Sequence, residues 1–128
     1  MLFLFLVFSI SACSNNQVAN NQIAEKQKVL RHLVAFQFKE DVSDQQKEEA
    51  IQIFRDLVGK IPEIKKFEGG ENINTEGRNK GFTHFCLLTF ENEAARDIYL
   101  PHPEHQRVVA ANKPLFSDLM VVDFWGEE

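Results

Sequence analysis

The sequence lacks three features that would assign it to common functional classes. It has no excess of basic residues, because 14 Lys and Arg face 19 Asp and Glu and give a formal net charge of -5. Nucleic-acid binding requires a clustered excess of Lys and Arg, so that class is excluded. The sequence has no apolar run of about 20 residues, the length that a membrane-spanning helix needs. With two cysteines in 128 residues, it also has no basis for a disulfide framework.

The first segment is a short apolar run that ends in Ile10-Ser11-Ala12-Cys13, of which the last three residues are small. Such a run is typical of a secretory signal peptide, and this ending resembles the lipobox of bacterial lipoproteins, whose cysteine is acylated. We therefore expect a signal peptide over residues 1–12, lipidation of Cys13, and a flexible polar tether over residues 13–28. The domain would be anchored to a membrane of the bacterial cell envelope, outside the cytoplasm. No Lys or Arg precedes the apolar run, and an uncleaved apolar tail is the alternative.

The remaining chain predicts one domain over residues 29–126. Strand patterns cover residues 29–39, 64–73, 82–90 and 118–125, and helices are predicted from an N-cap at Ser43 to Pro62, from Asn92 to Leu100 and from Pro103 onward. The middle helix is expected to turn Ala95, Ile98 and Tyr99 inward. Glycines 69 and 70 predict a bulge or a close approach of two backbones. The order is the ferredoxin-like βαββαβ arrangement, an α+β fold with a four-stranded antiparallel sheet.

Both helical units of this fold lie on one face of the sheet, so the other face needs a cover. Leu33, Ala35, Phe85 and Leu87 are predicted on that uncovered face. A second copy of the same sheet is the economical cover, and we expect a homodimer through this face. Cys86 belongs to an apolar run and is expected to be a small core residue rather than a nucleophile.

All four histidines are predicted on the side of the helices. His32 and His84 come from two strands, and His102 and His105 lie around the break between two helical segments, one turn after Tyr99, the only tyrosine. Each buried imidazole needs a hydrogen-bond partner and loses charge on desolvation. Their convergence predicts a functional pocket, and a purely structural polar cluster is the alternative.

Several segments of the domain resemble the stress-responsive A/B barrel (Dabb) family. These are RHLVAFQFK at 31–39, GFTHF at 81–85, LTF at 88–90 and YLPHPEH at 99–105. The resemblance runs from about Leu30 to Trp125, and its most specific part is the His-Pro-x-His step. It implies a ferredoxin-like subunit that pairs into a dimeric α/β barrel. A plant polyketide cyclase of this family works without a cofactor, and its catalytic tyrosine and histidine match Tyr99 and His105.

The resemblance implies roles for particular residues. Tyr99 and His105 would be catalytic, and the substrate-binding residues would be His32, His84, His102, Val34 and Phe36. Neutral His105 would take a proton from the carbon next to a carbonyl, while Tyr99 donates a hydrogen bond to the oxygen on which charge develops. The substrate would be a small apolar or aromatic carbonyl compound, and neither a cofactor nor a metal is required for this cyclase or lyase chemistry.

Two other functions remain open from the sequence. The same pocket would also suit a non-catalytic module that binds a small molecule in a stress response. Metal capture by the histidines is the third hypothesis, because His102 and His105 have the His-x-x-His spacing that can face one ion. No carboxylate or cysteine completes an obvious ligand set.

Overall fold

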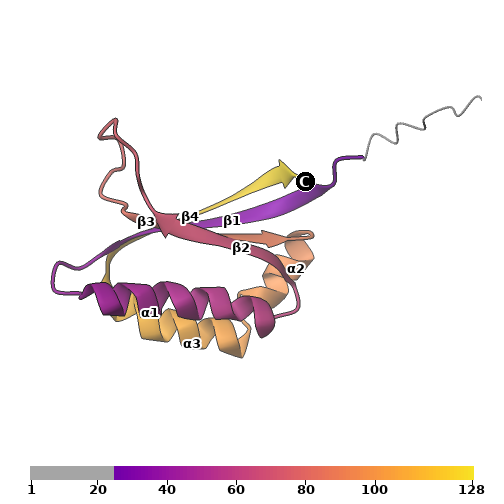
Figure 1. Cartoon of the computed structure of the whole chain (residues 1–128). Helices are drawn as coiled ribbons and strands as arrows, with labels where there is room; N and C mark the ends of the chain where they lie inside the picture. The colour runs from indigo at the N-terminus through magenta and orange to yellow at the C-terminus, as the bar shows by residue number, and fades with distance from the viewer. Residues whose placement is uncertain (1–24) are drawn as a thin grey trace, which may run out of the picture.

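The computed structural model describes residues 25–128, which form two layers (Figure 1). One layer is a four-stranded sheet, and helices cover one of its faces. The elements in chain order are β1 (Lys28–Phe38), α1 (Asp44–Arg55), the 3₁₀ helix η1 (Asp56–Gly59), β2 (Ile64–Glu71), β3 (His84–Phe90), α2 (Glu93–Tyr99), α3 (Pro103–Asn112), the 3₁₀ helix η2 (Lys113–Leu115) and β4 (Phe116–Glu127). The predicted signal peptide, Cys13 and the tether up to residue 24 lie outside the described residues.

The sheet has the strand order β2-β3-β1-β4, and all neighbouring strands are antiparallel. This order confirms the predicted ferredoxin-like fold, whose second helical unit consists here of α2 and α3. Strand β1 is central, and its residues from Leu30 to Phe36 have partners on both sides. His32 lies opposite Leu88 of β3 and opposite Asp123 of the edge strand β4. The register therefore places a carboxylate from the last strand beside an imidazole from the first.

Helix α1 begins at the capping box predicted for Ser43. The Ser43 hydroxyl accepts from the Gln46 backbone N–H at 3.2 Å, and the Gln46 side chain accepts from the Ser43 N–H at 3.0 Å. Phe54 of α1 packs into the core over the sheet. The segment was predicted as one helix up to Pro62, but the α-helix ends at Arg55 and the chain continues as η1, where Leu57 is fully buried.

Strand β2 comes unusually close to β3 at Gly69. A Cβ atom on Gly69 would lie 2.8 Å from the backbone oxygen of Phe85, whereas one on Gly70 would meet nothing within 4 Å. The predicted close approach of two backbones is confirmed at Gly69. The irregularity in the pairing lies nearer the start of the strand, between Ile64 and Lys66.

Helices α2 and α3 both begin at the residues that the sequence predicts. The Asn92 side chain accepts from the Ala95 N–H at 3.0 Å, and Pro103 occupies the first turn of α3. Tyr99, the last residue of α2, is fully buried. Ile98 was predicted to face inward as well, but it is 51% exposed. It is rotated about 100° around the helix from Tyr99, and the sheet covers only one of these two directions.

Strand β4 alternates between the two faces of the sheet. Leu119 and Val121 line a cavity under the helices, and Asp123 contacts His32 on that side. Met120, Val122 and Phe124 are directed to the opposite face and are 41%, 39% and 45% exposed.

The face opposite the helices is apolar, as predicted. Leu33 of β1 and Phe85 and Leu87 of β3 are partly exposed there, next to the β4 residues. Ala35 was predicted to need a cover, but its larger neighbours Phe85 and Met120 already bury it completely.

Candidate active site

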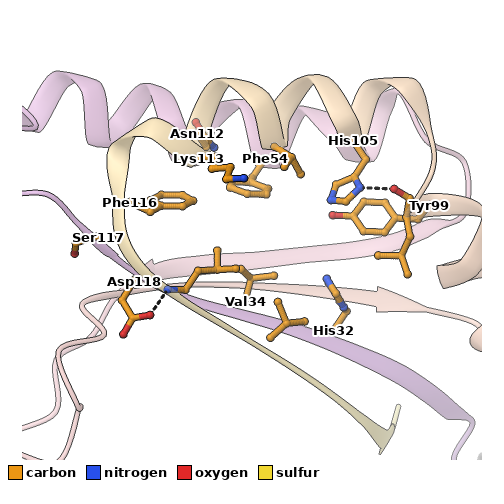
Figure 2. Close-up of a pocket in the computed structure, with 14 residues that line it drawn as sticks. His32, Val34, Phe54, Tyr99, His105, Asn112, Lys113, Phe116, Ser117 and Asp118 are labelled. Atoms are coloured by element: carbon orange, nitrogen blue, oxygen red, sulfur yellow. Dashed lines mark hydrogen bonds between the residues drawn. The ribbon is translucent and has the colours of Figure 1, made fainter.

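A cavity of about 550 Å³ lies between the sheet and the helices α2 and α3. One end of the cavity holds Tyr99, His105 and His32, and the other holds Ser117 and Asp118 (Figure 2). Asn112 and Lys113 lie beside Phe54 between these ends, and the remaining lining is apolar. The complete lining consists of His32, Val34, Phe54, Tyr99, Leu100, His105, Val109, Asn112, Lys113, Phe116, Ser117, Asp118, Leu119 and Val121.

The Tyr99 ring lies between two imidazoles. Its centroid is 4.1 Å from that of His105 and 5.8 Å from that of His32, which meets it edge to face. The Tyr99 hydroxyl is buried and makes no hydrogen bond among the described residues. Burial raises the pKa of the phenol, so the hydroxyl keeps its proton at neutral pH. An unpaired hydroxyl directed into a cavity can donate a hydrogen bond to an acceptor on a bound molecule.

His105 is oriented by the backbone at the end of α2. Its Nδ1 lies 2.8 Å from the carbonyl oxygen of Leu100, so Nδ1 carries the proton and donates it (Figure 2). The neutral ring then has its lone pair on Nε2, which makes no hydrogen bond within residues 25–128. Burial lowers the pKa of His105 most, the Leu100 hydrogen bond opposes this, and nearby His32 and His102 lower it further. His105 is therefore a neutral base at physiological pH.

His32 is held from outside the cavity by a carboxylate. Its Nδ1 lies 2.6 Å from an oxygen of Asp123, and the other oxygen of Asp123 accepts from the Arg96 guanidinium at 2.9 Å. His32 itself is 5% exposed. The sequence analysis did not identify Asp123 or Arg96.

The other two histidines do not join this cavity. His102 caps α3, since its Nδ1 accepts the Glu104 backbone N–H at 3.2 Å. His84 stacks on Phe36 with ring centroids 5.9 Å apart and lines a separate polar hollow between α1 and β2. The predicted meeting of four imidazoles is thus corrected to two. His84 and His32 share a face of the sheet, but the register sets them four residues apart along it, because His84 pairs with Phe36.

Of the two apolar residues predicted to bind the substrate, Val34 and Phe36, the cavity contains one. Val34 lines the cavity. Phe36 does not, because it is completely buried in an aromatic cluster with Phe38, Phe54 and Phe116. Phe116 supplies the aromatic wall of the cavity in its place (Figure 2).

Cys86 is a core residue, as expected. It is completely buried, and burial raises the pKa of its thiol to about 12. The thiolate, which is the nucleophilic form, is therefore negligible at neutral pH.

Residues 25–128 contain no group of three or more histidine, cysteine or acidic side chains arranged to hold a metal ion. The same residues include no helix that is long and apolar enough to cross a membrane. The side chains of His102 and His105 have separate hydrogen-bond partners in the backbone, the Glu104 N–H and the Leu100 carbonyl.

The family model described as Stress responsive A/B Barrel Domain matches residues 30–126. The chain is 27% identical over 95 residues to olivetolic acid cyclase of Cannabis sativa, covering 74% of this chain and 94% of the cyclase. It is 30% identical over 95 residues to the stress-response A/B barrel domain-containing protein HS1 of Arabidopsis thaliana, covering 74% and 87% of the two chains. A solved dimeric ferredoxin-like protein from Jannaschia sp. superposes with a TM-score of 0.67 at 28% identity, covering 75% and 97%.

Proposed function

Because this chain belongs to the stress responsive A/B barrel domain family, we propose that its cavity binds a small apolar or aromatic carbonyl compound and moves a proton at the carbon beside the carbonyl. The observation that carries this proposal is the buried, unpaired hydroxyl of Tyr99 next to His105. The proposed class of reaction is taken from the name of olivetolic acid cyclase, to which the chain is similar in sequence.

In the proposed reaction His105 is the general base. Its Nδ1–H is engaged by the Leu100 carbonyl, so the free lone pair on Nε2 is the proton acceptor. A carbon-bound proton next to a carbonyl leaves as His105 takes it, and the electron pair moves onto the carbonyl oxygen as an enolate. The lowered pKa of His105 keeps the ring in the neutral, accepting form.

Tyr99 stabilises the enolate oxygen. Its hydroxyl has no competing partner among the described residues, and burial keeps it protonated, so a ligand oxygen would satisfy it. The closing step of a cyclase would be attack of the enolate carbon on a second carbonyl of the same molecule. The apolar walls, among them Val34, Phe54 and Phe116, would exclude water and hold the substrate folded.

Solvent deuterium exchange tests this function without knowledge of the natural substrate. Aryl methyl ketones such as acetophenone are incubated in D₂O with the protein, and loss of the methyl proton signal is followed by NMR. We expect His105→Ala to slow exchange by about 10²–10⁴-fold and Tyr99→Phe by about 10²–10³-fold. His84→Gln is the matched control, because His84 lies in a different hollow. Equal exchange rates in wild type and both cavity variants would exclude the proposed roles.

Non-catalytic binding is the second candidate, favoured by the mostly apolar lining of the cavity. The same experiment separates the two functions. A pure binding module would show a ligand-induced thermal shift with acetophenone, retained in Tyr99→Phe, and no exchange above the buffer rate.

The homodimer is a further part of the proposal. Met120, Val122 and Phe124 give the sheet an exposed apolar face, and the related Jannaschia protein is described as dimeric. Two such faces packed together would remove both from water. A dimeric α/β barrel would result.

A lipid anchor on Cys13 remains a proposal that rests on the sequence Ile10-Ser11-Ala12-Cys13. It would hold the domain to a membrane of the cell envelope outside the cytoplasm. Cell fractionation with Cys13→Ser tests it: the variant is expected in the soluble fraction, and unchanged membrane retention would contradict lipidation.

A further inference from the structure

A chain of charged side chains leads from the surface of α2 to His32. Arg96 binds the carboxylate of its neighbour Asp97 through two nitrogens, at 3.0 and 2.8 Å, and reaches Asp123 with its third nitrogen at 2.9 Å. Asp123 in turn binds His32 at 2.6 Å. Asp97 fixes the guanidinium, the guanidinium fixes one oxygen of Asp123, and the other oxygen remains for the imidazole.

This geometry determines where the proton of neutral His32 lies. A carboxylate only accepts hydrogen bonds, so the His32 nitrogen that faces Asp123, Nδ1, must be the donor. The lone pair is then on Nε2. The one side-chain hydrogen bond of His32 among the residues that the structure describes is that of Nδ1, and His32 is part of the cavity wall below the Tyr99 ring (Figure 2). In its neutral form, His32 therefore offers Nε2 as a hydrogen-bond acceptor to a ligand in the cavity.

The acceptor on His32 complements the donor on Tyr99. A carbonyl oxygen has no hydrogen to give to Nε2, and a carboxylate would be repelled by Asp123 on the far side of the ring. A hydroxyl group fits, because it donates one hydrogen bond. We propose that Arg96 and Asp123 are positioning residues that hold His32 as an acceptor, and that the cavity therefore selects ligands bearing a hydroxyl group, such as phenols and enols. This rests on the proposed function only for the carbonyl group that the same ligand presents to Tyr99.

The protonation state of His32 is directly measurable by ¹⁵N NMR of the imidazole rings. On the neutral plateau of a pH titration, His32 is expected to carry its hydrogen on Nδ1, which is the minor form of free histidine. Asp123→Asn and Arg96→Gln are expected to shift the ring toward the Nε2–H form. Arg107→Gln is the matched control, because Arg107 pairs with Glu104 at 2.8 Å on the exposed side of α3. An Nε2–H ring in the wild type, or an Nδ1–H ring that persists in both variants, would overturn the positioning role.

Ligand selection is measured with 4-butylphenol and its methyl ether, 4-butylanisole, by isothermal titration. Wild type is expected to prefer the phenol by roughly threefold to tenfold, the worth of one hydrogen bond. Asp123→Asn should reduce this preference to about unity, and Arg107→Gln should keep it. Equal affinity for the two probes in wild type would refute the selection. Neither probe is turned over, so the result is independent of the exchange test of His105 and Tyr99.

Discussion

Replacing Tyr99 by phenylalanine should stabilise the fold while it impairs the site. The Tyr99 hydroxyl is buried and unpaired among the described residues, and such a group costs about 1–3 kcal/mol in lost hydration. Tyr99→Phe removes this cost and keeps the ring, whose centroid lies 5.1 Å from Phe90 and 4.1 Å from His105. We expect the free energy of unfolding to rise by about 1 kcal/mol, which for a domain of about 100 residues raises Tm by roughly 4–8 °C.

Urea unfolding followed by circular dichroism measures this change, with Thr89→Val as the matched control. The Thr89 hydroxyl is also completely buried, but it accepts a hydrogen bond from Arg31. Its removal should lower the free energy of unfolding by about 1–2 kcal/mol. The two deletions of a buried hydroxyl are thus expected to have opposite signs. A loss of stability in Tyr99→Phe as large as that in Thr89→Val would show that the phenol has a partner in the folded protein and would refute the reasoning.

Three other predictions concern stability and assembly. Burial lowers the pKa of His84 and of His105 from the ordinary 6.5, so the unfolded chain binds more protons than the folded one. The free energy of unfolding should therefore fall as the pH drops below about 6.5. Urea titrations at pH 7.5 and 5.5 should show this loss of stability, and a smaller loss in His105→Gln. Gly69→Ala should lower the free energy of unfolding by about 1–3 kcal/mol through its clash with a β3 carbonyl. Gly70→Ala, which meets nothing, should stay within about 0.5 kcal/mol of wild type, and equal effects would contradict the close approach. Val122→Lys should convert the proposed dimer into monomers in sedimentation velocity, and a variant that sediments as a dimer would place the interface elsewhere.

The fold was predictable because its signals are local. The alternation of β1, the capping box at Ser43, the cap at Asn92 and the proline at 103 each act within a few residues, and all four appear in the structure. Their order along the chain then leaves few topologies, of which the ferredoxin-like one is observed.

The site was predictable only in part, because its geometry depends on register. Alternation places His32 and His84 on one face, but it does not say how far apart they lie along the strands. The contact between Asp123 and His32 joins residues 91 positions apart. The parity of β4 does put Asp123 on the same side as Leu119 and Val121, which was the available signal. Its partner on β1 becomes known only with the register in which β4 pairs with β1.

The alternation of β4 has a consequence for how proteins of this architecture can diverge. Odd positions from 119 to 123 face the side of the helices and the cavity, and even positions from 120 to 124 face the opposite side. A single substitution therefore changes either the lining of the cavity or the exposed face of the sheet, and rarely both. On the proposed function, selection can adjust ligand binding and self-association independently along one stretch of six residues, whereas a one-residue insertion there would exchange the two sets at once.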